Sequence, residues 1–141
     1  MKQYYSILND VLGPVMTGPS SSHSAGCARI GRTARLLWGR EITHADVVFE
    51  ERGSYPGTYI GQGSDFGFTG GLMGFTPDDI RLKDAVKIAR DSGRKITFKK
   101  ESLGLKHPNQ AEIRVYDERG NIGMTLMTYS VGGGMFLIDR M

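Results

Sequence analysis

The last third of the chain most limits the folds that this sequence can adopt. Residues 95–102 (KITFKKES) and 111–118 (AEIRVYDE) alternate as strands do. The segment RGN then predicts a hairpin turn, with residues 122–131 (IGMTLMTYSV) as the return strand and residues 135–139 (MFLID) as a short final strand. A closing antiparallel meander of this kind argues against a purely parallel, doubly wound sheet.

Helical spacing and stop signals predict the elements before this meander. Residues 4–11 have apolar side chains at helical spacing, and Gly13-Pro14 ends that first helix. Ser21 or Ser22 is expected to cap a second helix, roughly His23 to Trp38. Its expected buried side consists of Ala25, Ala28, Leu36 and Leu37.

The middle of the chain is predicted to hold one strand, a loop and two helices. Residues 45–52 (ADVVFEER) are typical of a strand, residues 53–64 of a loop, and residues 64–75 of a short glycine-rich helix capped by Ser64-Asp65. Residues 80–93 suit an amphipathic helix that ends at Gly93 and buries Ile80, Ala85, Val86, Ile88 and Ala89. We therefore expect one α+β domain over residues 1–141, with a single mixed or antiparallel sheet and helices mostly on one face.

Composition excludes several functional classes. The net charge is only +3, and basic residues are interspersed with acids, so we expect no nucleic-acid partner. No apolar run approaches the roughly 20 residues that span a bilayer. Cys27 is the single cysteine and can form neither an internal disulfide nor, alone, a zinc or iron–sulfur site, which take about four ligands. Without a visible signal peptide, the expected location is the cytoplasm.

Four glycine- and hydroxyl-rich motifs are candidates for chemistry. In TGPSSSHSAG, Ser20, Ser21, Ser22, His23 and Ser24 stand at the expected start of a helix. Free N–H groups and the helix dipole favour an anion there, so we expect this loop to bind a carboxylate or phosphate. The alternative is a helix cap with spare serines.

The other three motifs follow along the chain. GSYPGTYIGQGSD, residues 53–65, is a glycine-rich loop that matches neither the Walker spacing nor GxGxxG. LKHPNQAEI presents His107 and Asn109 from a turn that Pro108 stiffens, and TYSVGGGMF lets a ligand or partner approach the backbone beside Ser130. A flexible loop and a surface turn are the alternatives for the first two.

Together and in this order, the four motifs resemble the beta subunit of iron–sulfur-dependent L-serine dehydratase, also called L-serine ammonia-lyase. The family pattern IGPSSSHTAG-AARIGR is similar to TGPSSSHSAGCARIGR here, and its YGSF…GHGTD is similar to RGSYPGTYIGQGSD. The element HPN is preserved at residues 107–109, and the family's SIGGG is SVGGG at residues 130–134. The resemblance covers nearly all 141 residues.

This resemblance implies an enzyme that converts L-serine or a related hydroxy amino acid to a 2-keto acid and ammonia. A 4Fe–4S cluster held by three cysteines of a separate alpha subunit would act as a Lewis acid on the departing hydroxyl, and this chain would close over it. The implied partners are that alpha subunit and a small amino acid substrate, and we also consider a homodimer of the isolated chain. The implied fold resembles the allosteric substrate-binding domain of a D-3-phosphoglycerate dehydrogenase.

The resemblance also implies the site residues. The catalytic candidates are His23, His107 and Ser64, and no residue of this chain is expected to bind a metal. The substrate-binding candidates are Ser20, Ser21, Ser22, Ser24, Gln62, Asn109 and Ser130.

Two departures from the family pattern bear on these roles. Gln62 and Ser64 stand where the family has His and Thr, and the amide of Gln does not titrate near neutrality. His23, His107 or a residue of the alpha subunit must then carry the proton, or the substrate differs. Many family members also continue into an ACT-type regulatory domain, and we expect this chain either to lack that domain or to have been cut before it.

A function from another class remains open. The same serine-rich helix start would suit a stand-alone domain that senses a small carboxylate without chemistry, and the loss of the family His at Gln62 favours it. A neighbouring gene for a cysteine-bearing alpha chain would favour the dehydratase.

Gln62→His is predicted to raise turnover of L-serine in the assembled enzyme and to lower turnover of its preferred substrate. The reason is that Gln offers both a donor and an acceptor to a substrate that a histidine would crowd or charge. Keto-acid release from a panel of hydroxy amino acids measures both effects. If L-serine is already the best substrate and the variant changes nothing, Gln62 lies outside the site.

Overall fold

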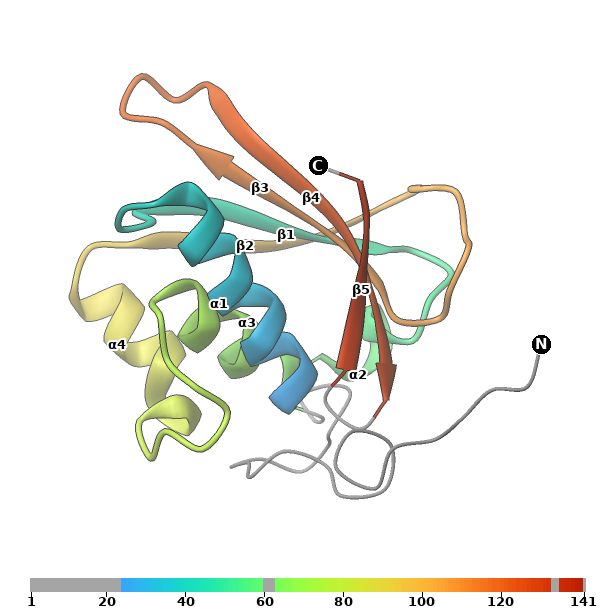
Figure 1. The fold of residues 1–141 in the computed structure, drawn as a ribbon, viewed down its shortest axis with the longest axis horizontal. Helices are drawn as coiled ribbons and strands as arrows, with labels where there is room; N and C mark the ends of the chain where they lie inside the picture. Colours follow the sequence, from blue (N-terminus) through green and yellow to red (C-terminus); the bar gives the residue numbers. More distant parts are fainter. Residues whose placement is uncertain (1–23, 60–62, 133–134, 141) are drawn as a thin grey trace.

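A single mixed sheet of five strands organises the molecule. In the computed structural model, which describes residues 24–59, 63–132 and 135–140, the strand order is β2-β1-β3-β4-β5. The strands are β1 (His44–Glu50), β2 (Lys95–Glu101), β3 (Gln110–Tyr116), β4 (Ile122–Gly132) and β5 (Met135–Arg140). β1 and β2 run parallel and the other neighbours run antiparallel, so the expected α+β fold with one mixed sheet is confirmed (Figure 1).

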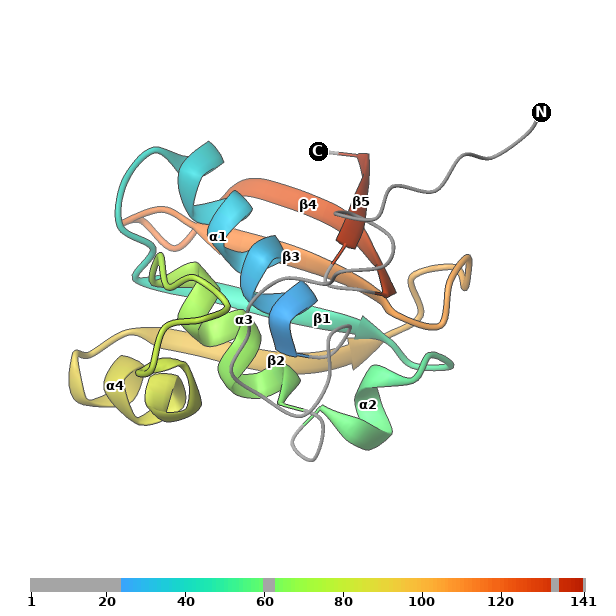
Figure 2. The same cartoon turned by 60° about the horizontal axis from the view of Figure 1, so that its bottom comes forward.

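The helices of the described residues are α1 (Gly26–Trp38), α2 (Tyr55–Thr58), α3 (Ser64–Leu72) and α4 (Ala85–Asp91), with a 3₁₀ turn at Leu82–Asp84. Figures 1 and 2 show α1, α3 and α4 on the same face of the sheet, with α2 at one end of it. The helix expected within residues 4–11 lies outside the described residues.

The core lies between this helical layer and one face of the sheet. Alternate strand residues point into it because successive side chains of a strand face opposite sides. The sheet contributes Ala45, Val47, Phe49, Ala111, Ile113, Val115 and Leu126, and the helices contribute Cys27, Ile30, Ala34, Tyr55, Phe68 and Leu72.

Glycine allows α1 and α3 to pack with their backbones in contact. A Cβ on Gly31 of α1 would lie 2.7 Å from the Phe68 carbonyl oxygen and 2.8 Å from the Leu72 nitrogen of α3. A Cβ on Gly71 of α3 would in turn meet the carbonyl oxygen of Ala28. All three neighbours are backbone atoms and cannot rotate away, so Gly31 and Gly71 must be glycine.

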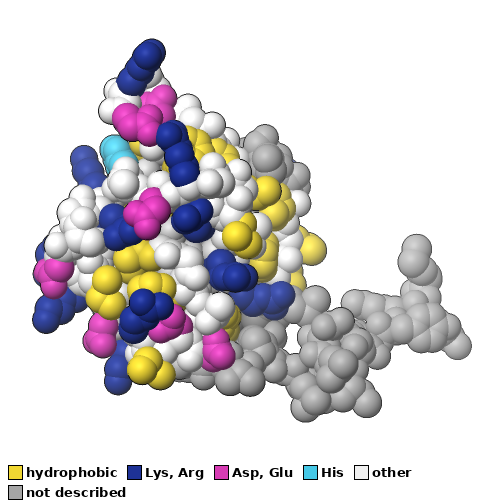
Figure 3. Space-filling model, turned by 60° about the vertical axis from the view of Figure 1, so that its left-hand side comes forward, with side chains coloured by type: hydrophobic (Ala, Val, Ile, Leu, Met, Phe, Trp, Pro, Cys, Tyr) yellow, Lys and Arg dark blue, Asp and Glu magenta, His cyan; other side chains and the backbone are white. Residues whose placement is uncertain are grey.

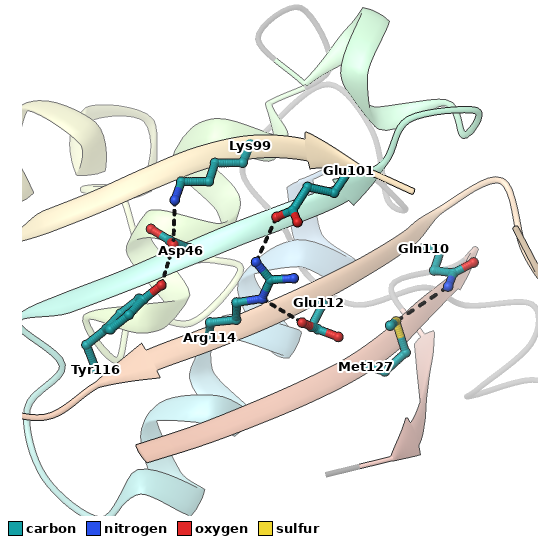
Figure 4. Close-up of polar contacts among 8 residues, drawn as sticks. All are labelled: Asp46, Lys99, Glu101, Gln110, Glu112, Arg114, Tyr116 and Met127. Carbon is teal, nitrogen blue, oxygen red and sulfur yellow. Dashed lines mark hydrogen bonds and ion pairs between the residues drawn. The ribbon is translucent and has the colours of Figure 1, made fainter. Parts of the chain in front are cut away.

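The opposite face of the sheet carries a layer of paired charges. Asp46, buried on that face, accepts hydrogen bonds from Lys99 Nζ at 2.9 Å and from the Tyr116 hydroxyl at 2.7 Å (Figure 4). Arg114 bridges Glu112 and Glu101 at 2.6 and 2.7 Å. Burial alone would raise the pKa of Asp46, but these two donors outweigh it and lower the pKa.

Charges of both signs also mix over the side of the molecule drawn in Figure 3. Lys and Arg side chains there are interspersed with Asp and Glu over most of the face. That distribution agrees with the alternation of basic and acidic residues along the sequence.

The second predicted helix ends at Trp38 as expected but buries a different stripe, and its expected start at His23 lies outside the described residues. Ser24 and Ala25 already form a π-helical turn that leads into α1, and Ala25 and Ala28 are buried as predicted. The prediction for Leu36 and Leu37 is wrong, because they are 62% and 46% exposed. Cys27, Ile30, Gly31 and Ala34 form the buried stripe at helical spacing, and it leaves the two leucines on the outer side.

Three local predictions in the middle of the chain are also wrong. The expected loop of residues 53–64 contains α2, where Pro56 fits the first turn of a helix. The cap of α3 is Gly63, in the left-handed conformation at φ 83°, and not Ser64-Asp65. Ile80 precedes the helical residues and is 81% exposed, and Leu82 is buried in the smaller core beneath α4.

Gly31→Ala is predicted to lower the free energy of unfolding by about 1–3 kcal/mol, the range typical of overpacking a close contact. The added methyl would push α1 away from α3. Gly57→Ala is the matched control, because a Cβ there meets no atom within 4 Å. Urea unfolding followed by circular dichroism measures both variants, and equal midpoints would show that the helices do not depend on this contact.

Candidate functional site

The turn after β1 and the loop between β2 and β3 meet beyond the carboxyl end of β1, where Glu50 contacts both. The Glu50 side chain is fully buried. Its Oε1 accepts from the Arg52 backbone nitrogen and from Arg52 Nε at 3.3 and 3.2 Å, and its Oε2 accepts from the Leu103 nitrogen at 2.6 Å. Burial alone would raise the pKa of Glu50, but these donors lower it, so the carboxylate stays ionised at neutral pH. Figures 1 and 2 show the turn after β1 and the loop between β2 and β3 side by side.

Ser54 joins the turn after β1 to the HPN element. Its backbone nitrogen donates to the Pro108 carbonyl at 2.7 Å, and its hydroxyl contacts the same carbonyl and the Asn109 side-chain oxygen. Gly53 permits this approach, since a Cβ there would lie 2.5 Å from the Pro108 oxygen. Two of the motifs, 54 residues apart in the sequence, are therefore in direct contact.

Asn109 extends the connection to the strand that precedes the triple glycine. Its side-chain nitrogen donates to the Ser130 carbonyl at 3.3 Å, and the Ser130 nitrogen donates to the Asn109 carbonyl at 3.0 Å. The Asn109 backbone nitrogen also donates to Nδ1 of His107 at 3.0 Å. An imidazole that accepts at Nδ1 carries its proton on Nε2 when it is neutral, so His107 is oriented as a donor. The Tyr129 ring stacks beside it, with centroids 6.0 Å apart.

Beneath these loops lies a buried polar cluster of Cys27, Tyr55, Ser64 and Ser130. The Cys27 thiol donates to the Tyr55 hydroxyl at 3.6 Å, and Tyr55 also contacts the Ser130 hydroxyl. Burial raises the pKa of Cys27 to about 12, although Tyr55 and Ser64 oppose the rise. Burial likewise raises the pKa of Tyr55 well above its usual value. Both groups are therefore neutral at physiological pH, and the cluster links three of the motifs.

The starts of α1 and α3 meet at the same end of the molecule. Ser24 is fully buried, and its carbonyl oxygen would lie 2.7 Å from a Cβ at Gly67 in the first turn of α3. Ser64, the first residue of α3, is also fully buried. Asp65 follows it, and partial burial raises the pKa of its carboxyl group. Ser24, Ser64 and Asp65 therefore belong to one polar region that the two helix starts create.

The structure thus describes five of the ten predicted site residues, and all five lie in these connected segments: Ser24, Ser64, His107, Asn109 and Ser130. Ser20, Ser21, Ser22, His23 and Gln62 lie outside the described residues. Sequence reasoning missed Glu50, Arg52 and Tyr55. Ser54 and Tyr55 stand inside a motif that was recognised, but nothing in the local sequence of β1 indicates that Glu50 is buried.

The cysteine of this chain does not fit a cluster ligand. The Cys27 thiol is fully buried and hydrogen-bonded to Tyr55, whereas a cysteine that binds a cluster must be a thiolate that reaches the iron. Among residues 24–59, 63–132 and 135–140, no group of three or more His, Cys, Asp or Glu could hold a metal ion. Nor does any helix of that part of the chain have the length and apolar character needed to cross a membrane.

Two relatives of this chain share the name of one enzyme subunit. The chain is 45% identical over 137 residues to a Bacillus subtilis (strain 168) protein named "Probable L-serine dehydratase, beta chain". It is 35% identical over 130 residues to the "L-serine dehydratase, beta chain" of Peptoniphilus asaccharolyticus. The alignments cover 97% and 92% of this chain. No family model matches the sequence.

The chain is therefore a homologue of L-serine dehydratase beta chains, and the resemblance expected from the four motifs is confirmed. It spans 60% and 57% of the lengths of these two relatives. A Streptomyces coelicolor protein named "L-serine dehydratase" is 33% identical over 87% of this chain and only 31% of its own length. The matched region is thus part of a longer chain in each of the three relatives.

Cys27 is predicted to resist thiol reagents in the native chain. Raising the pKa from 9.0 to about 12 lowers the thiolate fraction at pH 8 by about 1,000-fold relative to an ordinary thiol. Labelling with a maleimide at pH 8, followed by mass spectrometry, should show slow modification that becomes fast in urea. Lys83→Cys in a Cys27→Ala background is the exposed control. Equal rates at the two positions would contradict the buried cluster.

Proposed function

We propose that this chain is the beta subunit of a hydroxy amino acid dehydratase that releases a 2-keto acid and ammonia from L-serine or a related substrate. The names of its homologues support a serine dehydratase subunit. The observation that carries the proposal is the contact of Ser54 and Ser130 with Asn109, which brings together three motifs that are far apart in the sequence. If the HPN element were only a surface turn, Asn109 would not need contacts with both Ser54 and Ser130.

In this proposal the chain works only with a cluster-bearing alpha subunit. The name beta chain implies such a partner for the relatives, and the buried Cys27 of this chain does not fit a cluster ligand. When bound in the alpha subunit, a 4Fe–4S cluster would supply a Lewis acid for loss of the substrate hydroxyl. This chain would close over the cluster with the end of the molecule at which its motifs meet.

The residues of this chain would bind the substrate and hold a proton. With Nδ1 accepting from Asn109, His107 presents a proton at Nε2, which suits hydrogen bonding to a substrate oxygen rather than abstraction of the α-proton. That leaves His23 or a residue of the alpha subunit as the base. Asn109 would keep His107 in this orientation, and Ser64 would lie at the start of α3, where an anion is favoured.

Asn109→Ala is predicted to lower kcat/KM of the assembled enzyme by roughly tenfold, because each lost hydrogen bond contributes about 0.5–1.5 kcal/mol. Co-expression with the alpha chain under anaerobic conditions, followed by a keto-acid assay, measures the effect. Asn121→Ala in the exposed β3–β4 hairpin is the control and should keep wild-type activity.

The same preparation tests the proposal itself. The isolated chain, reconstituted with iron and sulfide, should give no cluster absorption and no activity. If the assembled complex releases no keto acid from any hydroxy amino acid but the chain still binds small carboxylates, the sensing function is favoured instead.

A further inference from the structure

Arg52, in the turn after β1, has a guanidinium group that is held in place by Glu50 and is still exposed at its terminal nitrogens. The buried Glu50 carboxylate accepts from its backbone nitrogen and from Nε, so the side chain is held at its base. The two terminal nitrogens make no hydrogen bond or ion pair with any residue that the structure describes, and the side chain is 58% exposed. Half of the guanidinium group is therefore used for orientation and the other half remains open.

Arg81 is an example, in the same chain, of a guanidinium group that is already engaged by other residues. It also follows its carboxylate by two residues and is equally exposed, at 59%. Asp79, however, accepts from both Nε and Nη2 of Arg81, at 3.0 and 2.7 Å, and the group lies over the Phe75 ring. Arg52 differs because both of its terminal nitrogens are available. We therefore interpret Arg81 as a structural ion pair and Arg52 as a group that can bind a ligand.

A hollow of about 330 Å³ opens beside Arg52. It is lined by Arg52, Leu105, Lys106, His107 and Pro108, which we call the Arg52 hollow. None of these lining residues is acidic, and Glu50 lies behind Arg52 with both oxygens already accepting hydrogen bonds. His107 accepts from Asn109 through Nδ1, so its Nε2 is a donor. Leu105 and Pro108 supply an apolar wall.

We propose that the Arg52 hollow binds the carboxylate of a small carboxylic acid, with the terminal nitrogens of Arg52 as a planar fork and His107 Nε2 as a further donor. A guanidinium fork matches the two oxygens of a carboxylate, and a second positive side chain, Lys106, raises the local potential. The apolar wall suits a carbon chain of a few atoms. Only the identity of that acid, as substrate or product of the dehydratase, rests on the proposed function.

Binding to the full 141-residue chain tests this directly. Sodium pyruvate and L-serine are titrated into labelled protein while the Arg52 Nε–H and His107 imidazole signals are followed by NMR, with sodium chloride at equal ionic strength as reference. Saturable shifts of both signals are expected. No saturable shift up to about 50 mM acid, or the same shifts with chloride, overturns the proposal, because a carboxylate fork discriminates where a bare charge does not.

Variants separate the fork from simple charge. Arg52→Gln should abolish binding, and Arg52→Lys, which keeps the charge but not the planar fork, should weaken it at least about tenfold. Arg81→Gln is the matched control and should bind as the wild type does. Thermal melts check that each variant is folded. If folded Arg52→Lys binds pyruvate with wild-type affinity, the proposed binding by the planar guanidinium fork is wrong.

The assembled enzyme distinguishes this inference from the proposed function. If the bound acid is the substrate, Arg52→Lys should raise KM while kcat stays near the wild-type value, and unchanged KM overturns that assignment. A wild-type complex without dehydratase activity overturns the proposed function and leaves the binding result intact. If Arg52→Gln weakens assembly with the alpha chain but not binding of pyruvate, the hollow receives an acidic side chain of the partner, and the proposal fails.

Discussion

The backbones of α1 and α3 are in direct contact, and this contact sets the positions of the segments around them. Gly31 and Gly71 leave no side chain between the two helices, so the backbones of the helices lie against each other. As a result, the starts of the two helices also meet, with Gly67 against the Ser24 carbonyl. The polar end of the molecule is therefore a consequence of how its apolar middle is packed, because helices crossing at a greater distance would separate Ser24 from Gly67.

Buried polar groups then determine how the loops lie on this frame. Glu50 fixes the turn after β1 and the loop after β2, since an ionised carboxylate must find donors when it is removed from water. Asn109 in turn joins that loop to β4. Cys27 and Tyr55 differ, because burial keeps them neutral and they serve as the floor of the site. The carboxylate of Glu50 and the amide of Asn109 thus hold the loops, and neutral hydroxyls and a thiol fill the space beneath.

Periodicity predicted most of the strands but only part of the helices. Strand alternation in residues 95–131 depends on neighbours two residues apart and is visible locally. The buried stripe of α1 depends on which face meets α3, so Leu36 and Leu37 looked as suitable as Cys27 and Gly31. The prediction that Ile80 is buried was wrong for a similar reason, because Leu82 occupies the buried position instead.

The resemblance to L-serine dehydratase beta chains, the motifs and most of the elements could be predicted from the sequence alone, because each depends on residues close together in the chain. His107, Asn109 and Ser130 were candidates from their motifs alone. The contact of Ser54 with Asn109, and the bonds from Glu50 to Arg52 and to the distant Leu103, became apparent only in the folded chain. The physical reason is that β1 and β3 are neighbours in the sheet although about sixty residues separate them, and hydrogen bonds between their flanking loops have no local signature.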